Sequence, residues 1–334
     1  MKKFMNEPEL FEADMLEGIL FAHAKELQSL TADNRAIVRQ ASPTVGKVGL
    51  ATGGGSGHLP LFLGYVGKGL LDGVAVGDVF ASPSASVMLE TTRHIDSGNG
   101  VLYLYGNYGG DVLNFDMAAE MARIEGITVE SVVGTDDVAS APKGMEDKRR
   151  GIAGLFYLFK VAGAKADQGA SLSEVKRVAE KAKQRTRSMG VAFSPCYLPY
   201  NKKESFTIGE NEMEVGMGIH GEPGIIRLAV ESSNRIVHRT MEAIESDLPL
   251  KSGTEVSVLV NGLGATSKEE LYIIYRDVHR WLTQRNISVV FPYVGEFATS
   301  MEMAGMSISI MWLDEELKEL LAAPCDTPFW RQNL

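Results

Sequence analysis

The sequence predicts an α/β protein made of two α/β domains, each with a largely parallel or mixed sheet and flanking helices. Three observations lead to this fold class. Short uncharged runs alternate with longer segments whose apolar residues recur every three or four positions, as strands and helices do in sheets with crossover connections. Several of the short runs end in glycines, as buried parallel strands do before a turn. The length of 334 residues exceeds what one hydrophobic core usually supports, which indicates two domains.

The first half of the chain alternates strands and helices from about residue 47 onward. Its predicted strands cover residues 47–52, 74–80, 101–105 and 127–133. Its predicted helices cover residues 11–27, 84–95 and 115–125, and a further helical stretch runs from 149 to about 186 and includes a helix over 172–185. Because strands separated by helices are joined by crossovers, we expect neighbouring strands to run parallel.

The second half repeats this pattern after a domain boundary that divides the chain into residues 1–187 and 188–334. Its predicted helix covers residues 268–284, and its predicted strands cover residues 189–193, 256–260, 288–292 and 307–312. The last residues, 322–334, contain two prolines and a tryptophan, and we expect them to form an ordered cap or a contact between domains or subunits.

Composition excludes several classes of function. There are 33 lysines and arginines against 43 aspartates and glutamates, and the net charge of −10 argues against binding to nucleic acid or an anionic membrane. No apolar run is long enough to span a bilayer, and the N-terminus lacks the apolar core of a secretion signal, so we expect a cytoplasmic protein. The two cysteines, Cys196 and Cys325, belong to no disulfide framework or metal motif.

A glycine cluster follows the first predicted strand. Residues 53–58 read Gly-Gly-Gly-Ser-Gly-His, and such a segment lets the backbone approach a ligand closely at the end of a parallel strand. The cluster matches neither the nucleotide-binding P-loop, which ends in Gly-Lys-Ser/Thr, nor the G-x-G-x-x-G fingerprint, because His58 occupies the sixth position. A tight turn with an incidental histidine is the alternative. We favour a functional role.

Asp111 lies in a second glycine-rich segment, which follows the predicted strand 101–105. If the two strands are neighbours, this carboxylate lies near the first cluster and can exchange a proton with a substrate hydroxyl. Asp111 can equally be the cap of a following helix. The motif alone does not decide between these two roles.

His220 lies in a third segment, Gly-Ile-His-Gly-Glu-Pro-Gly at residues 218–224. An imidazole in such a loop can be a nucleophile, a base or a metal ligand, although a lone histidine is more often structural. A metal site made by His58, Asp111 and His220 is disfavoured, because their spacing matches no local metal pattern. Two further loops, at residues 261–266 and 295–300, are interpreted as structural, with Thr266 or Ser267 capping the next helix.

Together these segments resemble the dihydroxyacetone kinase family, specifically its ketose-binding subunit, over nearly the whole chain. The resemblance rests on the three segments above and on further motifs in the same order, at residues 77–83, 107–115, 261–266 and 299–307. It implies that His220 bonds through Nε2 to the ketone carbon as a hemiaminal. It also implies that Gly55, Ser56 and Gly57 contact the substrate hydroxyls, and that His58 and Asp111 serve the terminal hydroxyl, with His58 as general base.

The resemblance implies partners as well. This chain would carry no cofactor of its own, and ADP or ATP with Mg²⁺ would be bound by a separate nucleotide-binding subunit. That subunit would receive its phosphoryl group from ATP or from a phosphotransferase-system protein. The ketose-binding subunit itself would be a homodimer.

Two positions depart from the family pattern. Many members have glutamate where this chain has Leu59, and a lysine near the substrate is replaced by Gly106. One interpretation is a reshaped pocket, in which a four-carbon ketose such as erythrulose uses the space beside Gly106. The alternative is a non-catalytic ketose sensor that keeps the capture histidine and acts as coactivator of a transcription regulator.

Overall fold

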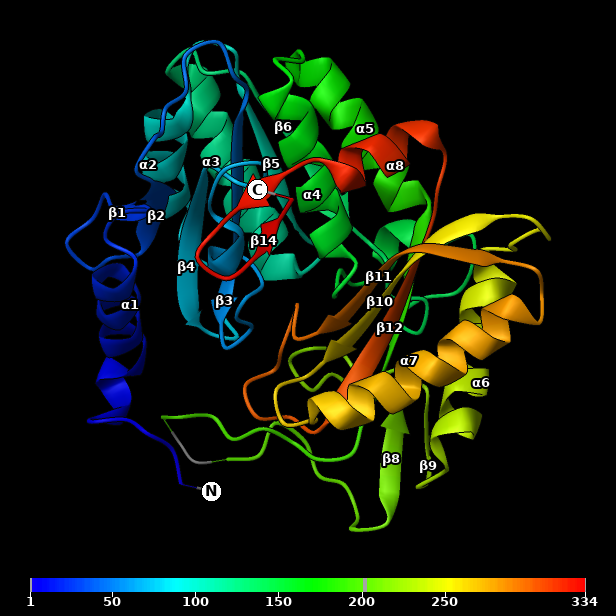
Figure 1. Ribbon diagram of the computed structural model, residues 1–334. Helices are drawn as coiled ribbons and strands as arrows, with labels where there is room; N and C mark the ends of the chain where they lie inside the picture. The colour runs from blue at the N-terminus through cyan, green and yellow to red at the C-terminus, as the bar shows by residue number, and fades with distance from the viewer. Residues whose placement is uncertain (1, 201–202, 334) are drawn as a thin grey trace.

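The computed structural model describes residues 2–200 and 203–333, which form two six-stranded sheets and the helices that cover them (Figure 1). The first sheet is parallel from β4 to β6, while β1 and β2 join it antiparallel. Its strands, in spatial order, are β1 (Leu27–Ser29), β2 (Ala36–Arg39), β4 (Gly73–Val79), β3 (Gly49–Ser56), β5 (Val101–Gly106) and β6 (Val129–Gly134).

The second sheet is mixed, and only its β10–β11 pair is parallel. Its strands, in spatial order, are β11 (Ser288–Gly295), β10 (Glu255–Gly262), β12 (Gly305–Trp312), β7 (Thr186–Ala192), β8 (Glu212–Val215) and β9 (Ile226–Ala229). The two sheets confirm the predicted α/β class.

The helices pack on the sheets through their apolar faces. In the first half, α2 and α3 share a core with one face of the sheet, and α4 and α5 belong to the main core. In the second half, α6 and α7 pack against each other and on the sheet (Figure 1). The helices are α1 (Phe11–Ala22), α2 (Ala85–Ile95), α3 (Gly109–Ile124), α4 (Leu155–Asp167), α5 (Leu172–Gln184), α6 (Ser233–Asp247), α7 (Lys268–Thr283) and α8 (Glu315–Ala322).

Several predicted boundaries are wrong. Helix α1 ends at Ala22, and Leu27 belongs instead to β1, where it pairs with Arg39 and is buried. Helix α3 begins at Gly109 rather than at residue 115, so Asp111 lies in its first turn. Ser267 caps α7 through a capping box, as predicted, whereas the Thr266 hydroxyl donates to the Gly305 carbonyl. The prediction missed β1, β2, β8, β9, α6 and α8, and also the two short C-terminal strands β13 (Cys325–Asp326) and β14 (Arg331–Gln332).

The end of the chain returns to the first half. Side chains of α8 join the main core, and the buried Lys160 of α4 donates to the Leu320 and Ala323 carbonyls at 3.1 and 2.7 Å. The C-terminal segment, red in Figure 1, accordingly lies beside α4. The second sheet starts at Thr186, close to the predicted boundary. Division at residue 187 remains a prediction, and residues 1 and 334 lie outside the described part of the chain.

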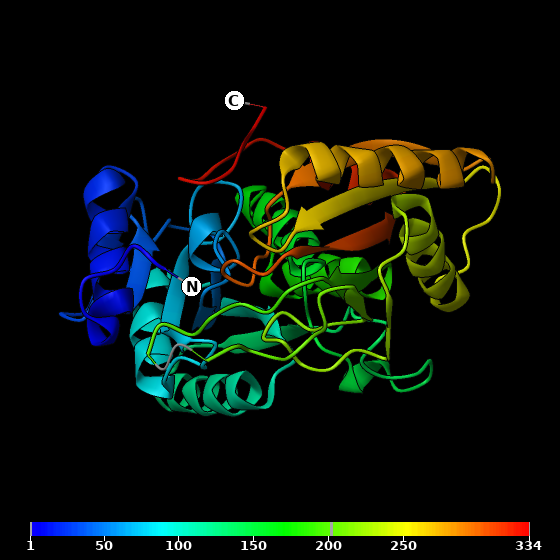
Figure 2. The same cartoon turned by 90° about the horizontal axis from the view of Figure 1, so that it is seen from below.

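Segments of the second half also cross to the first. The chain that follows β7 runs beneath the first half toward α1 (Figure 2). Within the described ranges, no helix combines the length and the hydropathy that a membrane span requires.

Candidate functional site

The site forms where the direction of the strand connections reverses in the first sheet. Strand β3 pairs with β4 on one side and β5 on the other, and ligands bind at the carboxyl ends of parallel strands at such a switch point. The β3–β5 ladder runs only from Gly49 to Ala51, so the last residues of β3 have no partner in β5. His58 follows the carboxyl end of β3 by two residues and therefore lies at this switch point.

The glycine cluster is strand, not loop. Gly53, Gly54 and Gly55 continue β3 and pair with β4, which corrects the prediction that the strand ends at residue 52. These glycines are required by close packing. A β-carbon on Gly54 would lie 2.2 Å from the Phe62 ring, and one on Gly55 would lie 2.6 Å from the Ala81 backbone nitrogen. Only Gly57, at φ +97°, adopts a conformation that favours glycine.

His58 is fully buried and its orientation is fixed. Its Nδ1 lies 2.7 Å from the Thr299 carbonyl, an acceptor, so Nδ1 carries the proton and Nε2 the lone pair. The ring stacks on Phe80 with centroids 4.9 Å apart. Burial, and then the charge of His220, lowers the pKa of His58 to about 3. His58 is therefore a neutral hydrogen-bond acceptor near neutral pH.

His220 lies in the loop between β8 and β9, with a carboxylate behind it. Nδ1 lies 2.9 Å from Glu222 Oε1, and the other carboxylate oxygen accepts the His220 backbone N–H at 3.0 Å. Burial alone would raise the pKa of Glu222, but the bond and charge of His220 and the charge of Arg150 lower it to about 2. In the neutral ring, this arrangement leaves the lone pair on Nε2, the atom that a nucleophile needs.

The two histidines meet at the site. Their ring centroids are 4.7 Å apart, and the His220 ring also lies edge-on to Tyr108 at 4.6 Å and to Phe80 at 5.3 Å. Phe80 is held at φ +59°, a strained conformation for a large side chain. An aromatic cage therefore fixes the position of His220.

Asp111 joins this cluster from the start of α3. Burial raises its pKa to about 6, partly opposed by a hydrogen bond from Ser82 and by the charge of His220. Tyr108 is the N-cap residue and makes no side-chain cap, so Asp111 is not the cap that was considered as an alternative. Within the described ranges, three buried atoms at the site have no hydrogen-bond partner: His58 Nε2, Asp111 Oδ1 and the Tyr108 hydroxyl. Burying unpaired polar atoms is costly, so the cluster is suited to a hydroxylated ligand.

Two further predicted residues, Ser56 and Gly106, are engaged in contacts with the protein itself. Ser56 lies beside the site, but its hydroxyl donates to the Gly77 carbonyl at 2.8 Å. Gly106 does not leave open space, because a β-carbon there would lie 3.0 Å from the Tyr108 ring and 3.2 Å from the Gly151 carbonyl oxygen. The ring of Tyr108 covers this space, so the expectation that a larger ketose uses it stays a prediction that depends on the position of that ring.

Sequence reasoning missed four contributors to the site: Glu222, Thr299, Phe80 and Tyr108. Glu222 follows His220 by two residues, a local signal that was available. Thr299 acts through its backbone carbonyl, which no side-chain pattern reports, and its segment was assigned a structural role.

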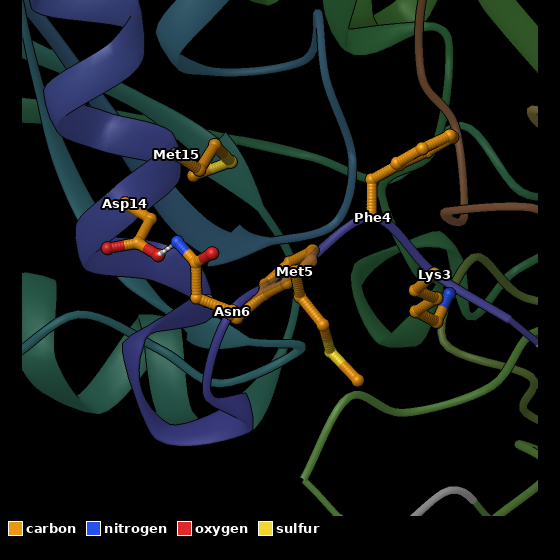
Figure 3. Close-up of a pocket in the computed structure, with 7 residues that line it drawn as sticks. Lys3, Phe4, Met5, Asn6, Asp14 and Met15 are labelled. Atoms are coloured by element: carbon orange, nitrogen blue, oxygen red, sulfur yellow. Dashed lines mark hydrogen bonds between the residues drawn. The ribbon is translucent and has the colours of Figure 1, made fainter.

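Away from the two histidines, a hollow of about 620 Å³ lies beneath the N-terminal arm at the start of α1 (Figure 3). Its two charged side chains are already paired: Asp14 accepts from Asn6 at 2.7 Å, and Lys3 binds Glu302. The hollow therefore offers no free charged group. Across residues 2–200 and 203–333, no three histidine, cysteine or carboxylate side chains are grouped as metal ligands would be.

Comparison with known proteins identifies a family and relatives of this chain. Residues 17–329 match the family described as the Dak1 domain. The chain is 46% identical to the "PTS-dependent dihydroxyacetone kinase 2, dihydroxyacetone-binding subunit DhaK" of Listeria innocua, covering 99% of each. It is 44% identical to the "D-erythrulose kinase" of Mycolicibacterium smegmatis, covering all of this chain and 57% of that protein. The structure of "Dihydroxyacetone kinase operon co-activator Dha-DhaQ" superposes with a TM-score of 0.90 at 32% identity, covering 98% of this chain and 100% of that one.

Proposed function

The chain belongs to the dihydroxyacetone kinase family as its ketose-binding subunit, and we propose that it captures a short ketose covalently on His220 for phosphorylation. The candidates are dihydroxyacetone and a four-carbon ketose such as erythrulose. The observation that carries this proposal is the contact between His220 Nδ1 and Glu222, which leaves Nε2 as the nucleophilic atom. Capture suits a small substrate, because a ketose of three or four carbons offers few contacts for tight binding.

The capture step forms one bond and opens another. The Nε2 lone pair attacks the ketone carbon, and the π electrons of the carbonyl move to its oxygen, which takes up a proton. The imidazole becomes positively charged as the C–N bond forms, and the Glu222 carboxylate stabilises that charge through Nδ1–H. Glycerol is rejected because it has no carbonyl to attack.

Asp111 is better suited than His58 to remove the proton from the terminal hydroxyl. A catalytic base works best when its pKa lies near the working pH, and the pKa of Asp111 is raised to about 6 whereas that of His58 is lowered to about 3. We therefore assign proton removal to Asp111. The terminal hydroxyl has one proton, which it donates to Asp111, so His58 Nε2 accepts a hydrogen bond from a second hydroxyl of the ketose and orients the substrate. Gly55, Ser56 and Gly57 remain proposed contacts to the other hydroxyls.

The phosphoryl group comes from a separate nucleotide-binding subunit that holds ADP or ATP with Mg²⁺. That subunit receives the phosphoryl group from ATP or from a phosphotransferase-system protein. The L. innocua relative is named as one subunit of a PTS-dependent kinase, which supports this division of labour. Helix α3, whose first turn carries Asp111, exposes one apolar stripe: Leu113, Met117, Met121 and Ile124. Exposed apolar stripes rich in methionine are typical of protein contacts, and we assign this stripe to the donor subunit.

A homodimer remains part of the proposal, and β9 is the surface that supports it. This strand is the outer edge of the second sheet, and Ile225, Ile226 and Val230 are exposed on or beside it. Antiparallel pairing of two copies about Leu228 brings Ile226 of one copy next to Val230 of the other. Val230 borders an apolar cavity of about 280 Å³ that also involves Phe193 and Ile273. A cytoplasmic location is proposed with the kinase function.

The second candidate function is a ketose sensor that acts with a transcription regulator. Its support is the structural similarity to a protein named as an operon co-activator. The retained Asp111, with its raised pKa, favours the kinase, because sensing requires capture but no base.

Crystals soaked separately with dihydroxyacetone and erythrulose test the capture. We expect continuous density from His220 Nε2 to the ketose carbon, and its absence in both soaks contradicts the proposal. Turnover with a nucleotide-binding subunit then separates the two functions. A captured ketose that is never phosphorylated supports the sensor.

A further inference from the structure

Arg150 connects the first half of the chain to the loop that carries His220. It lies between β6 and α4, and its side chain is largely buried. Its guanidinium donates through Nε to Asp137 Oδ2 at 2.9 Å and through Nη2 to the Gly216 carbonyl at 3.0 Å. Nη1 lies 3.9 Å from Glu222 Oε2. One side chain therefore touches both the start of the loop and the carboxylate behind the histidine.

Asp137 anchors this guanidinium firmly. Its side chain is fully buried and accepts the Ala139 N–H at 3.0 Å. Its backbone forms an isolated parallel β-bridge with Ser188 of β7. Burial, against the opposing charge of Arg150, raises the pKa of Asp137 to about 7. A buried carboxylate of this kind requires a charged partner, and the partner it has is Arg150.

Gly218 packs closely against both Arg150 and Glu222. A β-carbon there would lie 2.1 Å from Glu222 Oε2 and 2.6 Å from Arg150 Nη1. The φ of Gly218 is not in the left-handed region, so its lack of a side chain is explained by this contact rather than by the backbone. The loop is thus shaped around the Arg150–Glu222 contact.

We infer that Arg150 is a positioning residue for ketose capture, which holds the Glu222 carboxylate so that its other oxygen receives His220 Nδ1–H. This inference rests on the proposed function. Arg150 does not touch the substrate; it acts through Glu222. A guanidinium suits this role better than an ammonium, because its fixed fork reaches Asp137, Gly216 and Glu222 at once.

Two variants test the role by different means. Arg150→Gln removes the charge, whereas Gly218→Ala keeps every charge and forces the pair apart. Arg150→Lys is the conservative variant, and Arg239→Gln, which breaks an ion pair with Glu231 away from the site, is the matched control. Capture is measured as the change of the ¹³C signal of 2-¹³C dihydroxyacetone from a carbonyl to a tetrahedral carbon, and folding as the thermal midpoint.

We expect Arg150→Gln and Gly218→Ala to weaken capture at least about tenfold, with Arg150→Lys between them and the wild type. In turnover with the donor subunit, KM should rise more than kcat falls, because the adduct reacts normally once formed. Gly218→Ala keeps the proposal testable if Arg150→Gln does not fold. Capture within about twofold of wild type in the folded variants overturns the role of Arg150. Absence of capture in the wild type overturns the proposed function instead.

Discussion

His58 and His220 lie with ring centroids 4.7 Å apart and planes at 75°, although they lie in loops that follow strands of different sheets, β3 and β8. Each ring is oriented through Nδ1, His58 by the Thr299 carbonyl and His220 by Glu222. The two rings thus present their Nε2 atoms for different tasks. Burial keeps His58 neutral, and the carboxylate prepares His220 for positive charge.

Replacement of Asp111 by Asn should stabilise the protein while abolishing turnover. The folded pKa of Asp111 is raised to about 6, above its unfolded value, so ionisation opposes folding at neutral pH. Raising the pKa of this carboxyl from 3.8 to about 6 corresponds to about 3 kcal/mol at a pH above both values. Thermal unfolding should show the variant more stable than wild type at pH 7.5. The difference should shrink as the pH falls through 6 and should vanish only at about pH 3 and below, where Asp111 of the wild type is protonated in both the folded and the unfolded state. If the variant and the wild type differ in stability by the same amount at high and at low pH, burial of the ionised Asp111 carboxylate does not cost the assigned free energy.

Replacement of Glu222 by Gln should weaken ketose capture by roughly ten- to a hundredfold, by analogy with the loss of the hydrogen-bond partner of a metal-bound histidine. The amide can still accept Nδ1–H, but it cannot stabilise the charge that forms on the ring. Because the pKa of Glu222 is about 2, the carboxylate stays ionised throughout the range of a normal assay. Capture by the wild type should therefore show no inflection from Glu222 between pH 5 and pH 8. Titration with labelled ketose measures both effects, and unchanged affinity in the variant excludes a role for this carboxylate.

Replacement of Gly54 by Ala should destabilise the fold by roughly 1–3 kcal/mol, the usual cost of overpacking a core. Its β-carbon would lie 2.2 Å from the Phe62 ring, so the additional change Phe62→Leu should recover part of the loss. Gly109→Ala is the control, because nothing lies within 4 Å of a β-carbon at that position. Urea unfolding of the four proteins measures the differences. A Gly54→Ala variant as stable as the control contradicts the packing role of this glycine.

Replacement of Tyr108 by Ala should shift the substrate preference toward the larger ketose. The ring of Tyr108 covers the Gly106 α-carbon and lies edge-on to His220 at 4.6 Å. Its removal opens space beside the captured ketone, and it should lower kcat/KM less for erythrulose than for dihydroxyacetone. Tyr108→Phe keeps the ring, and its preference should match that of the wild type. If Tyr108→Ala lowers both values by the same factor, the ring only supports His220.

Met117→Asp and Ile226→Asp should have separate effects, and each is the control for the other. Both side chains are exposed, so neither change disrupts the core. Met117→Asp should reduce turnover with the donor subunit and leave the oligomeric state unchanged. Ile226→Asp should convert a dimer to a monomer in light-scattering measurements. A monomeric wild type contradicts the proposed β9 interface, and full turnover by Met117→Asp contradicts the α3 surface.

The long buried strands and several of the capped helices could be predicted from the sequence because their signals are local. Helix α2 begins after Ser84, whose side chain accepts the Val87 N–H, and α7 begins with its Ser267 capping box. Strand β9 could not be found this way: most of its residues are exposed at a sheet edge, so it lacks the alternation of a half-buried strand.

The structure brings three of the predicted side chains together, but the groups that support them could not be predicted from the sequence. His58, Asp111 and His220 stand out because titratable side chains beside glycines are unusual. The glycines themselves were misjudged, because a glycine that makes room for Phe62 has the same local signal as one that forms a loop. Contacts such as that of Arg150 with Asp137 and Gly216 depend on tertiary structure, and no sequence spacing reveals them.

The Thr299 carbonyl makes the protonation pattern of His58 depend on the docking of the two halves of the chain. The first half alone contains His58, but the acceptor that fixes its tautomer follows β11 in the second half. If the halves were to separate, the imidazole would be free to exchange its two neutral forms, and Nε2 would no longer be reserved as the acceptor. His58 Nε2 is therefore held as an acceptor only when the second half of the chain is docked on the first.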